Sequence, residues 1–268
     1  MNNKIKLGSL EINCFISGSN PLNGYSHQSK EKDKEMSDYF TFERMLKYLH
    51  QCEENGIDTI VARMDKLMIQ LFKEYWLQGG KIKWIGQTAR EYGSVKQNIT
   101  EGIKAGVSAL FIHGGTVDQH FREGIPEKLI EYVKYAKSFN LPVGVASHNP
   151  DCLLKLQDMD CENDFFLLSL YNINGYLGKK EISSDEKFDD QDRKKALQIL
   201  HSLKRPCILY KILGAGRKNL SEALIDISDY IRKCDGIMIG MYTKENENLI
   251  QENTEQFYKW RANLFVQQ

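Results

Sequence analysis

Short apolar runs alternate with longer amphipathic stretches along the whole sequence, and this alternation restricts the possible folds more than any other feature. Each apolar run is followed by a stretch with helical spacing of its apolar residues, as in Thr41–Glu54. Continuously apolar strands that alternate with helices are typical of a parallel sheet buried on both faces. The predicted strands are Ile12–Gly18, Asp58–Arg63, Ile82–Gln87, Ser108–His113, Leu141–Ser147, Phe165–Leu170, Cys207–Leu213 and Gly236–Met241.

The number of these units predicts a single (β/α)₈ TIM barrel that spans residues 1–268. Such a barrel typically needs about 250 residues, and the chain has 268. The rival fold is an open doubly wound sheet, which would carry a GxGxxG phosphate loop after its first strand. The segment at that place reads GSNPLNG and does not match. We therefore expect the active site at the C-terminal ends of the barrel strands.

Two connections are longer than a barrel requires, one after the first predicted strand and one after the sixth. Asn20–Tyr39 contains the charged run SHQSKEKDKE, and Asn172–Asp190 contains GKKEISSDEKFDD. Long loops in compact domains are usually lids or disordered segments. We expect Lys30–Glu35 and Gly178–Asp190 to be mobile lids, with solvated surface insertions as the alternative.

Composition argues for a soluble enzyme of the cytoplasm. Lys plus Arg and Asp plus Glu both number 36, so the charge carries no signature of nucleic-acid or anionic-membrane binding. The six cysteines form no CxxC pair, which favours reduced, structural thiols. The N-terminus lacks the apolar segment of a secretory signal, and no run approaches the roughly 18 apolar residues of a membrane span. The expected partner is a small-molecule substrate, and the oligomeric state stays open.

Polar residues stand at nearly every predicted strand end, where barrel enzymes carry their catalytic side chains. Two histidines, an arginine and a lysine at four strand ends would be costly to cluster without a ligand. A single strand-end histidine is often only a satisfied polar group, so the convergence carries the argument. The residues are Asn20, Asn23, Arg63, Asp65, Gln87, Thr88, His113, Ser147, His148, Asn149, Tyr171, Asn172, Lys211, Met241 and Tyr242.

Roles follow from the chemistry of each side chain. His113, followed by Gly114 and Gly115, is the predicted acid/base, because imidazole titrates near neutral pH. Lys211 and Arg63 are predicted to hold or polarise an oxyanion or phosphate. The residues predicted to orient the substrate are Asn20, Gln87, His148 and Asn172.

Two alternatives for these residues remain open. His27, His113 and His148 together would suit a divalent metal such as Zn²⁺ or Fe²⁺. Lys211, in the segment YKILGAGR, could be a desolvated base or Schiff-base nucleophile, or a cation paired with Asp65. The GAGR turn could also seat an anion on its backbone N–H groups, with Arg217 assisting.

Several segments resemble the aldo/keto reductase superfamily. LGSLEINCFISGSNPLNG is similar to that family's opening hairpin and first strand, and GIDTIVARMD to its second strand. ALFIHGG resembles its fourth strand, which ends in a catalytic histidine, here His113. ASHNP, LLSLYNI and IMIGMYTKENENLIQENTEQF resemble its fifth, sixth and last strands. The resemblance implies a TIM barrel, an oxidoreductase activity and NADP(H) as cofactor.

The sequence also departs from the family's catalytic tetrad. Alignment on Gly56 puts Val61 and Lys66 where the family has Asp and Tyr, and the lysine position falls at Gln87 or Thr88. Ordinary carbonyl reduction would then lack its acid catalyst. We expect a barrel enzyme that acts on a small polar, sugar-like carbonyl or hydroxyl substrate through histidine acid/base chemistry. The alternatives are a metal- or Schiff-base-dependent isomerase, epimerase or lyase, and a non-catalytic metabolite-binding barrel.

Overall fold

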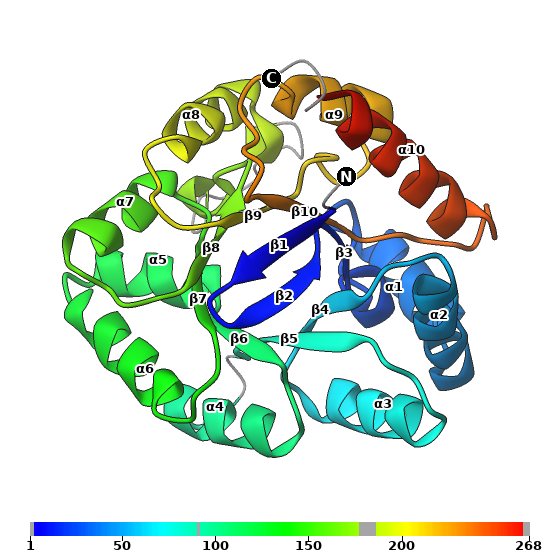
Figure 1. Cartoon of the computed structure of the whole chain (residues 1–268), viewed down its shortest axis with the longest axis horizontal. Helices are drawn as coiled ribbons and strands as arrows, with labels where there is room; N and C mark the ends of the chain where they lie inside the picture. The colour runs from blue at the N-terminus through cyan, green and yellow to red at the C-terminus, as the bar shows by residue number, and fades with distance from the viewer. Residues whose placement is uncertain (1–2, 90–91, 177–185, 265–268) are drawn as a thin grey trace.

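The computed structural model describes residues 3–89, 92–176 and 186–264. Eight parallel strands close into a barrel in the order β10-β3-β4-β5-β6-β7-β8-β9, with helices around it (Figure 1). The barrel strands are β3 (Phe15–Gly18), β4 (Thr59–Arg63), β5 (Lys83–Gln87), β6 (Ala109–Ile112), β7 (Val143–Ser147), β8 (Phe165–Ser169), β9 (Cys207–Tyr210) and β10 (Gly236–Ile239). The predicted (β/α)₈ fold is confirmed.

The helices follow the strands along the chain, as the alternation predicted. They are α1 (Lys30–Tyr39), α2 (Phe42–Glu54), α3 (Lys66–Leu77), α4 (Val95–Lys104), α5 (Gly114–Arg122), α6 (Glu127–Lys137), α7 (Pro150–Asp158), α8 (Asp190–Leu200), α9 (Leu220–Ile227) and α10 (Leu249–Leu264). Their apolar faces pack on strands that are buried on both sides, and Trp84 of β5 stacks on Phe72 of α3 with ring centroids 4.6 Å apart. No helix in the described part of the chain is long and apolar enough to span a membrane.

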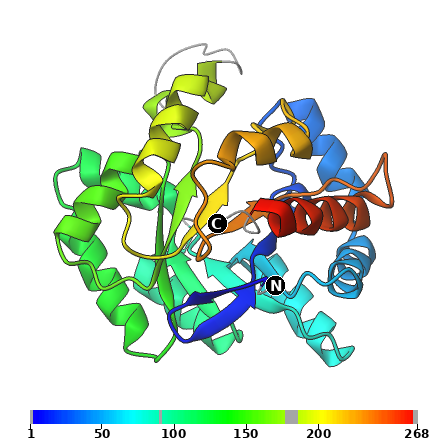
Figure 2. The ribbon, with the colours of Figure 1, turned by 45° about the horizontal axis from the view of Figure 1, so that its top comes forward.

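An antiparallel hairpin covers one end of the barrel. It consists of β1 (Lys4–Leu7) and β2 (Leu10–Asn13) and lies across the barrel in Figures 1 and 2. Its Ile5, Leu7 and Ile12 are buried, so the hairpin closes the core at this end. The strand predicted over Ile12–Gly18 is therefore two elements, because the chain bends at Cys14 between β2 and β3. The hairpin leaves the opposite end of the barrel uncovered, and a ligand site can lie there.

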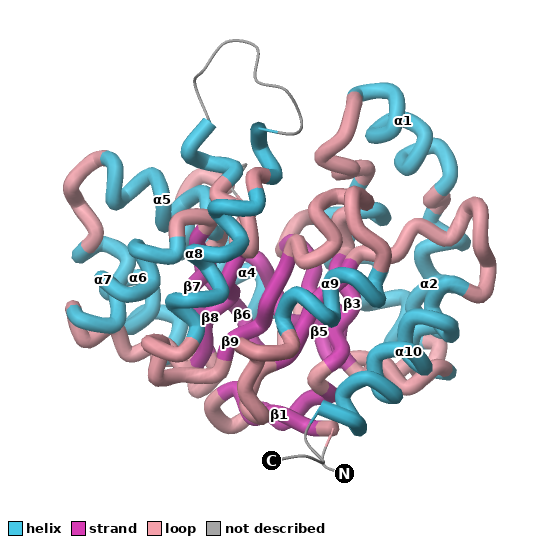
Figure 3. The backbone as a smooth tube through the Cα atoms, turned by 90° about the horizontal axis from the view of Figure 1, so that it is seen from above, coloured by secondary structure: helices cyan, strands magenta, loops and turns pink. Residues whose placement is uncertain are grey.

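The segment after β3 is more ordered than the sequence indicated. It begins with the 3₁₀ helix η1 (Pro21–Asn23) and continues into α1, whose first turn is capped by the Ser29 side chain. Met36 and Phe40 are buried, so this charged segment still anchors itself on the core. Figure 3 shows α1 and β1 at opposite ends of the molecule. The segment Lys30–Glu35, predicted to be a mobile lid, is helical and lies within α1, where a cap and buried anchors further along offset its charged composition. Its mobility stays a prediction.

The second long connection is described only in part. The short 3₁₀ helices η2 (Ile173–Tyr176) and η3 (Glu186–Phe188) flank residues 177–185, which lie outside the described residues. Most of the mobile segment predicted over Gly178–Asp190 falls there. Phe188 is buried and packs edge-on against Tyr171, with ring centroids 5.2 Å apart.

Candidate active site

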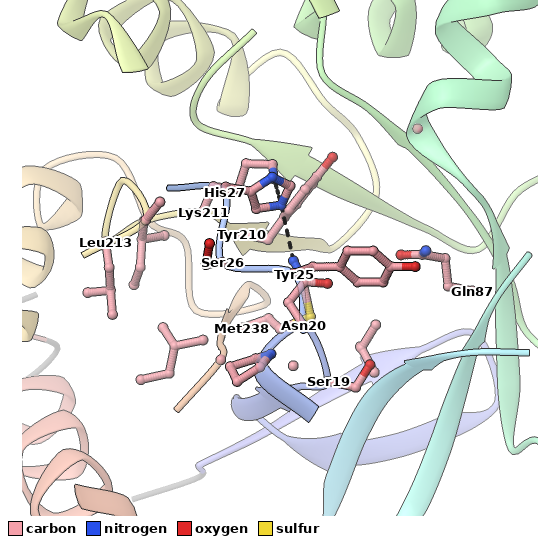
Figure 4. A pocket seen from close by; sticks show the side chains of 18 of the residues that line it. Ser19, Asn20, Tyr25, Ser26, His27, Gln87, Tyr210, Lys211, Leu213 and Met238 are labelled. Atoms are coloured by element: carbon pink, nitrogen blue, oxygen red, sulfur yellow. Dashed lines mark hydrogen bonds between the residues drawn. The ribbon is translucent and has the colours of Figure 1, made fainter. Parts of the chain in front are cut away.

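A cavity of about 430 Å³ opens at the C-terminal ends of the barrel strands (Figure 4). This volume lies in the range of small-molecule sites. Segments from both long connections border it, with Tyr25 from the first and Phe188 from the second. The structure brings most of the residues predicted from the sequence to this cavity: Asn20, His27, Arg63, Gln87, His113, His148 and Lys211.

Asn172 does not line the cavity in the structure. Its backbone N–H donates to the Asp192 carboxylate at 3.1 Å. Its side-chain oxygen accepts a hydrogen bond from the backbone N–H of Gly175 at 3.2 Å. Asn172 therefore organises the turn after β8, and a strand-end position alone did not distinguish that local role from substrate binding.

His148 is held by a buried carboxylate that the sequence reasoning missed. Its Nδ1 lies 2.9 Å from Oδ2 of Asp118, a residue of α5 that is 4% exposed. Because a carboxylate only accepts, Nδ1 carries the proton and Nε2 is the basic nitrogen of this imidazole. Burial alone would raise the pKa of Asp118, but hydrogen bonds from His148 and Ser147 outweigh it and lower that pKa. No helix had been predicted over Gly114–Arg122, so no sequence signal pointed to Asp118.

His113 lies beside this pair, with its ring centroid 6.3 Å from that of His148. It stands at the junction of β6 and α5, where its backbone N–H donates to the Thr88 hydroxyl at 2.9 Å. A Cβ on Gly114 would approach the His148 ring to 3.2 Å. The glycine that we expected to make room for substrate thus also makes room for the second histidine.

Lys211 and His27 form a second polar pair on another part of the cavity wall. Lys211 Nζ lies 2.9 Å from His27 Nε2, and Asn20 Nδ2 lies 3.3 Å from the same nitrogen (Figure 4). Both partners are donors, so Nε2 accepts and the imidazole is neutral. The Lys211 charge, followed by burial, lowers the pKa of His27 to about 3. Burial lowers the pKa of Lys211 to about 8.

The backbone at both members of this pair is unusual. His27 has φ 57° and Lys211 has φ 61°, in the left-handed region that non-glycine residues rarely adopt. Lys211 was predicted within a strand over Cys207–Leu213, but β9 ends at Tyr210 and the chain turns at Lys211. Strained residues that touch each other in a cavity wall are typical of functional sites.

The alternative in which Lys211 pairs with Asp65 is not formed in the structure. Asp65 caps α3 by accepting from the Met68 backbone N–H, and its other oxygen lies 3.3 Å from Nε of Arg63. The Arg63 guanidinium also lies 5.7 Å from the centroid of the Tyr25 ring. Asp65 therefore stabilises the β4–α3 junction and does not neutralise Lys211.

The alternative metal site is not formed. Within the described ranges, no three His, Cys, Asp or Glu side chains are grouped closely enough to hold a metal ion. Nε2 of His27 accepts from Lys211, and Nδ1 of His148 donates to Asp118. His27 thus lies on a different part of the cavity wall from His113 and His148. A ring nitrogen of His27 and one of His148 are already used in hydrogen bonds to Lys211 and Asp118.

The glycine-rich turn after β9 does not form the expected anion seat. Its N–H groups at Gly214 and Gly216 donate to carbonyls within the turn. The Arg217 guanidinium donates back to the Gly214 carbonyl at 2.8 Å and stands 4.4 Å from the centroid of the Phe188 ring. The N–H groups of both glycines are therefore used within the turn, which fixes the backbone at Lys211.

Comparisons with known proteins show which solved structures share this fold. No protein-family model and no curated protein matches the sequence. A proposed aldo-keto reductase from Pseudomonas aeruginosa superposes with TM-score 0.66 at 12% identity, covering 97% of this chain and 96% of its own. This superposition shows that the chain has the TIM-barrel fold. A proposed 2,5-diketo-D-gluconic acid reductase B matches with TM-score 0.58 at 10% identity, covering 98% of this chain and 91% of its own.

Barrels of other activities are similar too. An N-acetylneuraminic acid synthetase from Leptospira borgpetersenii matches with TM-score 0.60 at 10% identity, covering 99% of this chain and 91% of its own. One barrel fold hosts many chemistries, so this likeness speaks to the fold alone. At the tetrad positions inferred from the sequence, Val61 is buried and borders the cavity, Lys66 begins α3, and Thr88 supports the backbone of His113.

Proposed function

We propose that this barrel is an enzyme that moves protons on a small polar substrate carrying carbonyl and hydroxyl groups, with histidines as acid and base. The observation that carries the proposal is the contact between Asp118 and Nδ1 of His148 in the cavity wall. A buried carboxylate that fixes the tautomer of a histidine is the usual way to orient a general base. His148 is therefore the main base, and His113 is the second proton carrier.

The residues suggest a balanced sequence of proton transfers. Nε2 of His148 takes a proton from a carbon next to the substrate carbonyl, and the C–H electron pair moves onto the carbonyl oxygen. The ammonium of Lys211 stabilises the resulting oxyanion, which a half-buried cation does better than one in water. The His148 imidazolium then returns the proton to the former carbonyl carbon, while His113 transfers the proton of the neighbouring hydroxyl to the oxyanion. The carbonyl has moved by one carbon, so the net reaction is an isomerisation.

The residues do not fit the phosphates of the nicotinamide cofactor that the resemblance implies. In TIM barrels the phosphate site commonly lies in the loops after the last two strands, at a helix N-terminus. Here the N-terminus of α9 is closed by a capping box in which the Glu222 carboxylate faces the Asn219 backbone N–H. Lys218 is paired with Asp226 at 2.9 Å, and Lys244 with Glu35 at 2.9 Å. We therefore assign no hydride step.

The test is solvent-hydrogen exchange. Purified protein is incubated in D₂O with three- to six-carbon hydroxy-aldehydes, hydroxy-ketones and hydroxy-acids, and deuterium incorporation at carbon is followed by NMR. We expect incorporation that His148→Ala reduces by about 100-fold or more. Parallel reactions contain NADPH, and its absorbance is monitored to detect oxidation of the cofactor. Oxidation of NADPH without solvent exchange would refute the proposal in favour of a reductase, and binding without exchange would favour a non-catalytic barrel.

A further inference from the structure

The lining of the cavity is unbalanced in charge. Among the described residues that border it, Lys32, Arg63 and Lys211 are cationic, and none is an Asp or Glu. The nearest acid of the proton-transfer machinery, Asp118, is buried behind His148 and is not part of the lining. A cleft lined by one sign of charge concentrates ligands of the opposite sign.

The three cations differ in how they are compensated. Lys32 is paired with Glu35 at 3.1 Å, and Arg63 with Asp65 at 3.3 Å. Lys211 has no carboxylate partner among the described residues, and its ammonium donates a hydrogen bond to the neutral His27. A cavity-facing ammonium without a counter-ion is costly, and a bound anion removes that cost.

We propose that the substrate is a hydroxy- or keto-carboxylate whose carboxylate binds Lys211 beside Asn20 and His27. This proposal rests on the proposed function and names the substrate class for the same site. A singly charged carboxylate fits better than a phosphate dianion, because only one cation of the lining lacks an acidic partner. The cavity of about 430 Å³ has room for an acid of three to six carbons.

The backbone at Lys211 supports the assignment and guides the choice of variants. Its left-handed φ of 61° is strained, and the internal bonds of the glycine-rich turn maintain it. Met and Arg are unbranched at Cβ like Lys, so Lys211→Met and Lys211→Arg add no further backbone strain. Lys218→Met removes the same charge from the same turn, outside the cavity lining, and serves as the matched control.

The experiment is calorimetric binding at pH 7 with matched probes: glycerate against glycerol, gluconate against sorbitol, and glycerol 3-phosphate as the phosphate arm. We expect at least one of the two acids to bind at least tenfold more tightly than its neutral partner and than glycerol 3-phosphate. Lys211→Met should weaken the binding of that acid about tenfold or more, and Lys211→Arg should weaken it less. Lys218→Met should change the affinity for that acid by less than about twofold. Four results would each overturn the proposal. The acids could bind no more tightly than the alcohols, or not at all; glycerol 3-phosphate could bind more tightly than either acid; or Lys211→Met could leave the affinity for the acid unchanged.

The two proposals fail separately in these experiments. If an acid binds through Lys211 but its carbon-bound hydrogens do not exchange with D₂O, the carboxylate site stands and the proton-transfer function falls. If neutral hydroxy-ketones exchange rapidly and charge gives no preference, the function stands and the carboxylate site falls.

Discussion

The two polar pairs of the cavity differ in how the fold assembles them. The wall of β6 and β7 carries His113, His148 and Asp118, with the last two only 30 positions apart and the buried charge fully hydrogen-bonded. The wall that carries Lys211 and His27 joins residues 184 positions apart, both with left-handed backbone. The buried carboxylate of the first wall is paired without a ligand, whereas the second wall keeps an uncompensated cation. We infer that the first wall moves the protons, whereas the second wall binds the negative charge of the substrate and of the oxyanion.

Asp118→Asn should break the first wall with the largest effect. The amide can donate to Nδ1 only by reversing the tautomer, which would place the proton on Nε2 and remove the base. We expect solvent exchange to fall by about 100-fold or more, with an acid probe still bound through Lys211. A loss of binding equal to the loss of exchange would show that the two walls are not separate.

His113→Ala should affect the same wall with little structural cost. We expect exchange to fall about 100-fold, while the free energy of unfolding changes by less than roughly 1.5 kcal/mol, because His113 borders the cavity and is not core packing. Denaturant unfolding gives the control. Activity within a few-fold of wild type would remove His113 from the mechanism.

Lys211 separates an electrostatic role from a covalent one. Its lowered pKa of about 8 makes it a possible Schiff-base nucleophile, but it remains mostly charged at pH 7 and donates to His27. We expect no adduct on Lys211 after borohydride treatment with candidate carbonyl compounds, and substantial activity in Lys211→Arg. A trapped adduct identified by mass spectrometry, with an inactive Lys211→Arg, would establish the Schiff-base alternative.

His27→Gln gives the smallest expected effect and tests the second wall through stability. The pKa of His27 is about 3 in the fold against an ordinary 6.5, so the unfolded chain binds a proton that the folded chain does not. Wild-type stability should therefore fall as pH drops from 6.5 towards 3, and the glutamine variant should lose less over this window. Urea unfolding at pH 7 and pH 4 measures it, and identical losses would mean that His27 is not held neutral by Lys211.

The sequence predicted the barrel because strand and helix periodicities are local properties. It also predicted the histidines, Arg63 and Lys211 of the cavity wall, since the C-terminal ends of parallel strands meet at one end of a barrel. It missed Asp118, which lies on a helix rather than at a strand end, and it misassigned Asn172, whose turn geometry is invisible in residue order. It could not find the contact between His27 and Lys211, because closure of the whole barrel brings those residues together.

The pH dependence of solvent exchange tests the division between the two walls most directly. Lys211 must be protonated to hold the oxyanion, so kcat/KM in wild type should fall as pH rises through about 8, the pKa of that ammonium. Asp118→Asn should keep this alkaline limb at a much lower rate, and Lys211→Met should lose the limb altogether. An alkaline limb that persists unchanged in Lys211→Met would contradict the account.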